Sequence, residues 1–274
     1  MNYVTLNNGV KMPQLGLGVW RIPNEEVTEV VSEALDIGYR LIDTAGAYRN
    51  EKGVGDAIAA SQIPREEIFV TTKVRNSYQG YDNTLRSFEN SLKELQLDYI
   101  DLYLIHWPQP AYDQYVETFQ ALEKLYEEGL VRAIGVSNFN IEHLQRIFSE
   151  CEVTPVVNQV ECHPYLQQRE LKKFCQEHQI YIESYSPLFQ GGELLEDPVI
   201  TEMAARYNKT PAQVVIRWHL QEESIVIPKT VTPSRMKENL DVFDFQLTFE
   251  EMNQIKALNR NERKLPEPNE MNHR

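Results

Sequence analysis

A short apolar run rich in β-branched and aromatic residues, followed by a segment with helical periodicity, recurs along almost the whole chain. The clearest runs begin at Tyr39, Ile68, Tyr99, Val131, Val156, Ile180 and Ser224. Most successive starts lie about 30 residues apart, which is the length of one strand and its crossover helix. The repetition predicts parallel strands that alternate with helices, and the longer last interval leaves room for an extra helix.

The segments between these runs carry the apolar spacing of amphipathic helices. Between Val27 and Ala34, apolar residues fall at i, i+3, i+4 and i+7. Asn24 is a possible N-cap of this helix, and Gly38 stands where the helix would end. A further short strand over Gln14–Gly18 brings the expected strands to eight. Eight alternating units without a linker favour a closed (β/α)₈ barrel over an open doubly wound sheet.

A β-hairpin is expected ahead of the barrel, because Asn8 and Gly9 lie together between alternating apolar residues. With 42% hydrophobic and 25% charged residues, the composition is that of an ordinary globular protein long enough to bury a full core. We therefore expect an α/β fold in which residues 1–274 form a single (β/α)₈ TIM-barrel domain with an N-terminal β-hairpin.

The charge balance argues against partners that need a basic surface. The 27 Lys and Arg residues face 41 Asp and Glu, a net charge of −14, so nucleic acid is not an expected partner. The start, Met1–Gly9, lacks the features of a secretory signal, and no stretch approaches the ~20 apolar residues that cross a bilayer. The three cysteines show no CxxC spacing, so neither disulfides nor a metal site is expected. We expect a cytoplasmic monomer without a membrane partner.

Polar side chains end the apolar runs, where a barrel places its active site. Asp43 ends one run and Tyr48 follows shortly after it. Lys73 ends the next run, and His106 follows the third. Singly, each has a structural explanation, such as capping, packing or a solvated strand end. Together, an acid, a phenol, an amine and an imidazole from three consecutive strands indicate a catalytic site, because neighbouring strands lie only ~4.8 Å apart.

The common nucleotide-binding fingerprints are absent. Gly16–Arg21 has Arg where the third glycine of GxGxxG is required, and no P-loop occurs. Lys229–Lys237 instead carries three cations and no acid in this acidic chain. Thr232 could cap a helix there with Pro233 at its first position, so that backbone N–H groups and cations would face a phosphate together. The alternative is a solvated basic turn.

Six motifs make the chain resemble the aldo-keto reductases, most closely the short prokaryotic type that includes diketogluconate and glyoxal reductases. The motifs are DTAGAYRNE (43–51), LDYIDLYLIHWP (97–108), GVSNF (135–139), NQVECHPY (158–165), SYSPL (184–188) and IPKTVTPSRMKEN (227–239). The match runs in family order from Val4 to about Arg260. The resemblance implies a (β/α)₈ barrel that reduces a small-molecule carbonyl substrate with NADPH, releasing NADP+, without a Rossmann domain or a metal.

The resemblance also implies a role for each matching residue. Tyr48 would donate the proton, with Lys73 and Asp43 beside it and His106 orienting the substrate carbonyl. Trp20 and Trp107 would form walls of the substrate pocket. The cofactor would be held by Ser137, Asn138 and Gln159 at its carboxamide, Tyr185 on the nicotinamide face, Ser186 and Leu188 along the pyrophosphate, Lys229, Thr230 and Arg235 at the 2′-phosphate, and Glu238 and Asn239 at the adenine.

The chemistry explains why these groups would occur together. Hydride delivery to a carbonyl carbon makes its oxygen alkoxide-like, so the site needs a proton donor whose pKa lies nearer the working pH than the ~10 of free tyrosine. We expect the ammonium group of Lys73 to lower the pKa of Tyr48, and Asp43 to keep Lys73 charged. A neutral His106 could donate a hydrogen bond to the carbonyl oxygen.

The sequence leaves three alternatives open. Arg75 stands where relatives often carry an aromatic residue; it could extend into solvent, or point into the cleft and favour carboxylate-bearing substrates. Glu161 and Glu183, on adjacent predicted strands, could form the carboxylate pair of a glycosidase, although Glu183 lies below the rim. A barrel that binds the dinucleotide as a sensor, without turnover, is the third. The complete catalytic set favours the enzyme.

Overall fold

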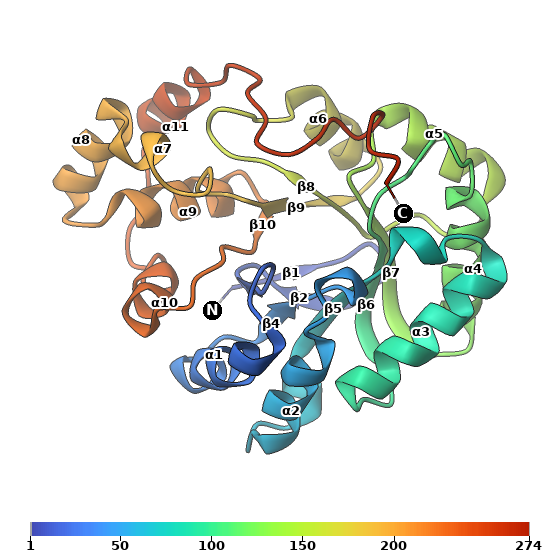
Figure 1. Ribbon diagram of the computed structural model, residues 1–274. Helices are drawn as coiled ribbons and strands as arrows, with labels where there is room; N and C mark the ends of the chain where they lie inside the picture. Colours follow the sequence, from blue (N-terminus) through green and yellow to red (C-terminus); the bar gives the residue numbers. More distant parts are fainter. Residues whose placement is uncertain (1, 274) are drawn as a thin grey trace.

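A computed structural model describes residues 2–273, and helices surround its parallel strands (Figure 1). The parallel strands are β3 (Leu17–Gly18), β4 (Leu41–Asp43), β5 (Phe69–Val74), β6 (Ile100–Ile105), β7 (Val131–Ser137), β8 (Val157–Glu161), β9 (Tyr181–Tyr185) and β10 (Ile225–Val226). Each pairs with its neighbours in chain order from β3 to β10. The predicted order of parallel strands is confirmed.

Backbone bonds between the two ends of this sheet close it into a barrel. Leu15 and Val226 form a parallel bridge. The Gly16 amide donates to the Val226 carbonyl oxygen at 2.9 Å, and the Val226 amide donates to the Gln14 carbonyl oxygen at 3.0 Å. The segment predicted as a strand over residues 14–18 therefore joins β10 to β4, and the (β/α)₈ barrel is confirmed.

Helices follow the strands as the periodicity predicts. The α-helices are α1 (Asn24–Ile37), α2 (Glu51–Ala60), α3 (Tyr81–Leu95), α4 (Tyr115–Glu127), α5 (Ile141–Glu150), α6 (Arg169–Glu177), α7 (Glu193–Glu196), α8 (Pro198–Tyr207), α9 (Pro211–Gln221), α10 (Pro233–Leu240) and α11 (Phe249–Lys256). Three 3₁₀ turns are η1 (Gly46–Tyr48), η2 (Arg65–Glu67) and η3 (Asn76–Tyr78). The long interval before β10 holds α7, α8 and α9, which confirms that it has room for more than one helix.

The ends of α1 show one correction. Gly38 ends the helix as predicted, with φ +120° and its amide donating to the Ala34 carbonyl oxygen. Asn24, predicted as the N-cap, is instead the first helical residue, and Pro23 occupies the N-cap position. The Asn24 Oδ1 accepts from the Gly53 amide at 2.9 Å, so this side chain links α1 to α2 rather than capping its own helix.

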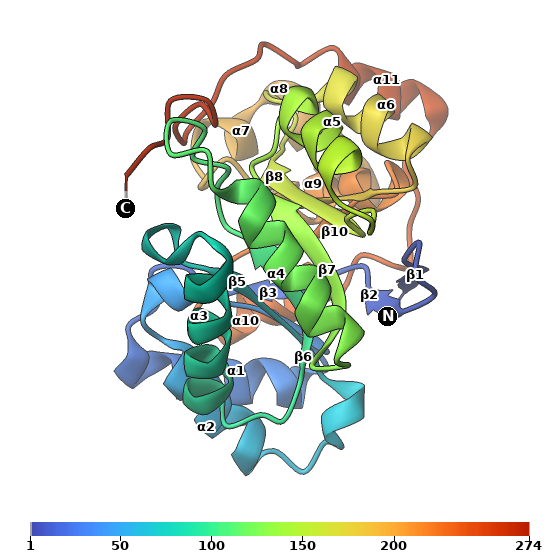
Figure 2. The ribbon, with the colours of Figure 1, turned by 90° about the vertical axis from the view of Figure 1, so that its right-hand side faces the viewer.

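The predicted N-terminal hairpin is present and covers one end of the barrel. Its strands, β1 (Tyr3–Thr5) and β2 (Lys11–Pro13), pair antiparallel. Gly9 has φ +85°, a conformation that favours glycine, and its amide donates to the Leu6 carbonyl oxygen at 2.8 Å. Leu6 and Met12 pack in the same buried cluster as Leu41 and Phe69, which start β4 and β5. The hairpin therefore covers the N-terminal ends of the strands (Figure 2) and does not cover their carboxyl ends.

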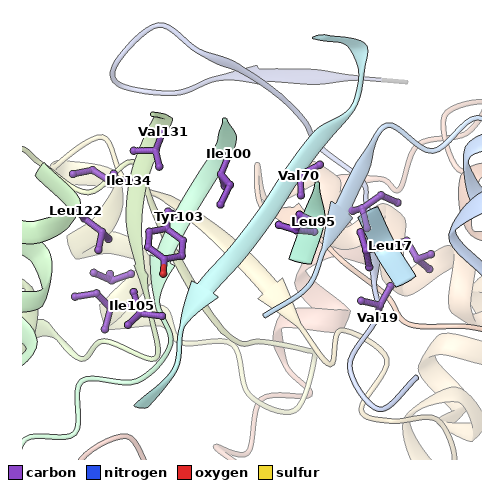
Figure 3. Packing of buried hydrophobic residues seen from close by; sticks show 14 of the residues in the cluster. Leu17, Val19, Val70, Leu95, Ile100, Tyr103, Ile105, Leu122, Val131 and Ile134 are labelled. Carbon is purple, nitrogen blue, oxygen red and sulfur yellow. The ribbon is translucent and has the colours of Figure 1, made fainter. Parts of the chain in front are cut away.

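Side chains alternate between the two faces of each strand, as the two-residue period of a strand requires. On β6, Tyr103 and Ile105 belong to the layer between strands and helices, whereas Leu102 and Leu104 belong to the cluster inside the barrel. Figure 3 shows the outer layer, in which Ile134 of β7 belongs to the same cluster as Tyr103. Inward-facing residues near the carboxyl ends of the strands are therefore free to build a polar site.

Within residues 2–273, no helix is long and apolar enough to cross a bilayer. The three cysteines are free thiols. In the same part of the chain, His, Cys, Asp and Glu side chains form no group of three or more that could hold a metal ion.

Candidate active site

An ion pair lies inside the barrel where β4 and β5 end. Lys73 Nζ donates to Asp43 Oδ1 at 2.8 Å and Oδ2 at 2.9 Å, and to the Thr44 carbonyl oxygen at 2.7 Å. Both charged side chains are buried. All three ammonium hydrogens have acceptors, so the charge of Lys73 is held in a fixed position.

Tyr48 and His106 complete this cluster. Tyr48 ends η1, the turn after β4, and His106 directly follows β6. Lys73 Nζ lies 5.1 Å from the centroid of the Tyr48 ring. The His106 ring meets the Tyr48 ring edge-on, with 5.7 Å between centroids. The structure thus brings together the four side chains that the sequence predicts as a catalytic set.

The protonation of Tyr48 differs from the expectation. Burial raises the pKa of Tyr48 above its ordinary value; the charge of Lys73 opposes this rise and that of Asp43 adds to it. The prediction that Lys73 lowers the pKa of Tyr48 below its ordinary value is therefore wrong. The loss of hydration on burial raises this pKa by more than the charge of the ammonium group lowers it. A phenol with a raised pKa keeps its proton at neutral pH, which is the state a proton donor needs.

The other two groups have the expected charge. Burial, and then the charge of Lys73, lowers the pKa of His106 to about 3, so the imidazole is neutral. Burial acts to lower the pKa of Lys73, but the charge of Asp43 and the hydrogen bond to it hold that pKa above its ordinary value. A neutral imidazole and a charged ammonium group therefore flank the phenol.

A second polar network extends from this cluster across β7, β8 and β9. Ser137 Oγ donates to the Gln159 carbonyl oxygen at 2.9 Å, and Asn138 Nδ2 donates to the His106 carbonyl oxygen at 2.9 Å. The Tyr185 hydroxyl donates to Asn138 Oδ1 at 2.7 Å. These bonds fix the hydroxyl and amide groups that the resemblance assigns to a carboxamide.

The backbone turns sharply where this network meets the rim. Asn138, just after β7, has φ +64°, and Ser186, just after β9, has φ +48°. Non-glycine residues take this left-handed conformation infrequently, and such residues gather at functional sites. Both positions were predicted to bind cofactor, so the backbone conformation supports a functional rim at these two strand ends.

A cleft of about 1110 Å³ opens above these groups at the carboxyl ends of the strands. It is lined by every predicted site residue except Lys73: Trp20, Asp43, Tyr48, His106, Trp107, Ser137, Asn138, Gln159, Tyr185, Ser186, Leu188, Lys229, Thr230, Arg235, Glu238 and Asn239. Lys73 lies beneath the cleft, bound to Asp43. The cleft is large enough for a dinucleotide together with a small substrate.

The cationic segment forms one wall of the cleft, as predicted. Helix α10 begins at Pro233 with Thr232 in the N-cap position. The Thr232 hydroxyl makes no capping bond, so the amides of the first turn remain for an external acceptor. Lys229 and Arg235 line the cleft beside this helix end. Cations, a helix N-terminus and the amide network suit a dinucleotide that carries an extra phosphate.

Some of the residues lining the cleft were not anticipated from the sequence. They include Arg21, Arg49, Gln190, Leu195, Thr210, Leu265, Pro266, Met271 and His273. The last four belong to the C-terminal tail, which returns to the rim from the far end of the chain. Gln109 Nε2 donates to the His273 carbonyl oxygen at 2.7 Å, so the tail is tied to the loop after β6. No local pattern in the tail indicates this return.

Arg75 lies at the cleft rather than extending away from it. Its side chain is half-buried and lines the cleft with Trp107 and Tyr48. Its Nε donates to the Gly46 carbonyl oxygen. Of the two orientations that the sequence left open, the structure therefore favours the one facing the cleft.

The two glutamates of the alternative glycosidase hypothesis, Glu161 and Glu183, do not line the cleft. Glu161 accepts bonds from the backbone amides of Lys264 and Leu265 at 2.7 and 3.0 Å, and Nε2 of His163 lies 3.0 Å from its carboxylate. Glu183 is buried inside the barrel, where it accepts from Gln159. The two carboxyl groups of a glycosidase must flank the substrate, so this geometry does not support the glycosidase hypothesis.

Comparisons with known proteins agree with this geometry. The profile of the Aldo/keto reductase family matches residues 12–260. The chain is 52% identical to glyoxal reductase of Bacillus subtilis (strain 168) over 98% of this chain and 96% of that protein. It is 51% identical to methylglyoxal reductase DkgA of Escherichia coli (strain K12) over 97% of each chain.

Solved structures show the same similarity. The crystal structure of a point mutant of Gox0644 in complex with NADPH superposes with a TM-score of 0.95, at 50% identity over 98% of each chain. MGS-M4, an aldo-keto reductase from a Medee basin deep-sea metagenome library, gives a TM-score of 0.94 at 48% identity, over 96% of this chain and 97% of that one. The similarity thus extends to the cofactor-bound state of a protein with this fold.

Proposed function

This chain belongs to the aldo/keto reductase family and reduces carbonyl compounds with NADPH, and on that premise we propose roles for the residues of its cleft. Tyr48 donates the proton that the substrate oxygen takes up. The observation that carries this role is the convergence of Lys73 and His106 on the ring of Tyr48, which lines the cleft. Buried Lys73 and Asp43 hold a fixed charge beside the phenol.

The chain's own groups act on the carbonyl oxygen. Bound NADPH supplies the hydride that adds to the carbonyl carbon. The neutral imidazole of His106 donates a hydrogen bond to the oxygen and orients it toward the Tyr48 hydroxyl. As the oxygen gains negative charge, Tyr48 transfers its proton, and the ammonium group of Lys73 stabilises the phenolate left behind.

The remaining cleft residues position the cofactor. Ser137, Asn138 and Gln159 bind its carboxamide, Tyr185 lies against the nicotinamide ring, Ser186 and Leu188 follow the pyrophosphate, Lys229, Thr230 and Arg235 bind the 2′-phosphate, and Glu238 and Asn239 contact the adenine. Support comes from the lining of one continuous cleft by all of these residues. The phosphate end carries cations in a chain of net charge −14, which concentrates a positive field there.

We propose small reactive aldehydes of the glyoxal and methylglyoxal type as substrates, because two similar proteins are reductases of those compounds. Trp20 and Trp107 form the apolar walls of the substrate end. The whole chain acts as one barrel domain, in the cytoplasm, as a monomer, without a nucleic-acid or membrane partner. The acidic charge supports the absence of nucleic acid, and light scattering after gel filtration tests the monomer.

Loss of NADPH absorbance with methylglyoxal tests the proposed function directly. We expect the protein to consume NADPH, whereas a sensor barrel would bind it without turnover. Tyr48→Phe should bind NADPH as tightly as the unmodified protein and lose turnover by roughly 10²- to 10⁴-fold, because only the proton donor is removed. Full turnover in that variant would refute the donor role.

A further inference from the structure

The side-chain amide of Gln159 donates both of its hydrogens to buried carboxyl groups. Its Nε2 donates to Asp43 Oδ2 at 2.7 Å and to Glu183 Oε2 at 2.9 Å. Glu183 lies directly opposite Gln159 in the register of β8 and β9, so the two side chains share the inner face of the barrel. A primary amide has only two N–H hydrogens, and both are used here.

This arrangement determines which end of the amide faces the cleft. A carboxylate oxygen accepts hydrogen bonds but cannot donate them, so the nitrogen of Gln159 has to face Asp43. Reversing the amide would place its oxygen against the Asp43 carboxylate and replace that hydrogen bond with a repulsion between two acceptors. Gln159 lines the cleft, and because its nitrogen is bound to the two carboxyl groups, its oxygen is the end of the amide left to accept a bond from a ligand there.

We propose that Glu183 is a positioning residue that, together with Asp43, turns the Gln159 amide so that its oxygen accepts the carboxamide N–H of the nicotinamide cofactor. The inference rests on the proposed assignment of Gln159 to that carboxamide. Glu183 does not line the cleft and acts only through Gln159.

The surroundings of Glu183 are difficult to explain by packing. Its side chain is fully buried, and its Oε1 has no hydrogen-bond partner among the described residues. Burying a carboxyl group with one unpaired oxygen costs free energy that an apolar side chain would avoid. Positioning of Gln159 provides a reason for a carboxyl group here.

The protonation of Glu183 is compatible with this role. Burial, and then the charge of Asp43, raises the pKa of Glu183 to about 8. The charged and titratable groups that influence it are Asp43 on β4 and Lys73 on β5, with Gln159 as the neutral bridge. A protonated Glu183 still accepts through its carbonyl oxygen, and it adds no second negative charge beneath the Asp43–Lys73 pair.

Binding of two nucleotides to the isolated full-length protein tests the proposal. One is NADP+, and the other is nicotinic acid adenine dinucleotide phosphate, in which a carboxylate replaces the carboxamide. An acceptor oxygen on Gln159 should repel that carboxylate, so the unmodified protein should bind NADP+ more tightly. The measured quantity is the ratio of the two Kd values from calorimetry at pH 7.

Removing the acceptor should reduce that preference. In Glu183→Leu, we expect the ratio to fall by about five-fold or more, because one of the two bonds that orient the amide is lost. Glu183→Gln keeps an acceptor oxygen and should retain the ratio within about two-fold. Glu183→Thr, too short to reach Gln159, serves the same purpose if the leucine variant does not fold.

Thr71→Val is the matched control, since Thr71 is buried on β5 and its hydroxyl has no partner among the described residues. It should leave both Kd values unchanged. A variant that weakens both nucleotides equally, with the ratio unchanged, would show that Glu183 is merely structural and overturn the proposal. An unmodified protein that binds both nucleotides equally would overturn the assignment of Gln159 itself, and one that binds neither would overturn the proposed function.

Discussion

Lys73 shows how strongly a single buried charge constrains its neighbours. Its ammonium group is removed from water and bonded to Asp43 and to the Thr44 carbonyl oxygen. A buried charge is stable only when it is paired, so the pair has to be built as one unit. Its fixed field acts on both neighbouring titratable groups: it lowers the pKa of His106 and opposes the rise at Tyr48.

Arg75 yields a prediction about substrate charge. Arg75 lines the cleft, and we expect the guanidinium nitrogens other than Nε, which binds Gly46, to bind a carboxylate there. In Arg75→Trp we expect kcat/KM for a carboxylated aldehyde to fall about ten-fold relative to the uncharged aldehyde, because a charged hydrogen bond is lost. Steady-state kinetics on the two substrates gives this ratio. An unchanged ratio would mean that the guanidinium does not select substrates.

At the scale of elements, strand ends and helix starts carry the site. Each barrel strand delivers its inward-facing side chain to the same rim, and α10 adds the amides of its first turn. The C-terminal tail that lines one side of the cleft, residues 264–273, is called the C-terminal strap below. Glu161 holds the start of this strap by accepting from two successive backbone amides.

The start of α10 predicts how the protein distinguishes the two nicotinamide cofactors. Only NADPH carries the 2′-phosphate that Arg235 is proposed to bind. Arg235→Ala should raise the Kd for NADPH by roughly ten-fold or more and leave the Kd for NADH nearly unchanged. Fluorescence titration measures both constants. Equal weakening of both cofactors would contradict the phosphate assignment.

Glu161 lies outside the cleft, but because it holds the C-terminal strap we expect its removal to change KM for the substrate. In Glu161→Ala, hydrogen exchange of residues 264–273 should accelerate, and KM for the aldehyde should rise several-fold with a smaller change in kcat. Asn269→Ala, which removes only an exposed bond to Glu142, is the control and should change neither quantity. Unaltered exchange in the Glu161 variant would show that the strap is held by its other contacts.

At the level of the whole molecule, we expect barrel closure to make the chain one cooperative unit. Residues 14–18 bond to β10, so segments more than 200 positions apart have to meet before the sheet is complete. The cleft likewise takes its lining from Gly18 to His273. A ligand that fills it should therefore stabilise the entire fold and not a local part.

Thermal unfolding tests this coupling. NADP+ at about 100 times its Kd should add about 2.7 kcal/mol of stability, which corresponds to a rise in Tm of roughly 5 to 10 °C in a single transition. The same concentration of NAD+ should raise Tm less, because it lacks the 2′-phosphate. Two separate transitions, only one of them sensitive to NADP+, would contradict a single cooperative barrel.

The alternation of strands and helices, the hairpin and the polar strand ends can all be predicted from the amino-acid sequence. These features depend on local spacing, namely a period of two for strands and about 3.6 for helices. Three features emerge only in the folded chain: the raised pKa of Tyr48, the return of the C-terminal strap to the cleft, and the two carboxyl groups that hold Gln159. Desolvation and register depend on contacts between distant segments, and no local pattern in the chain encodes them.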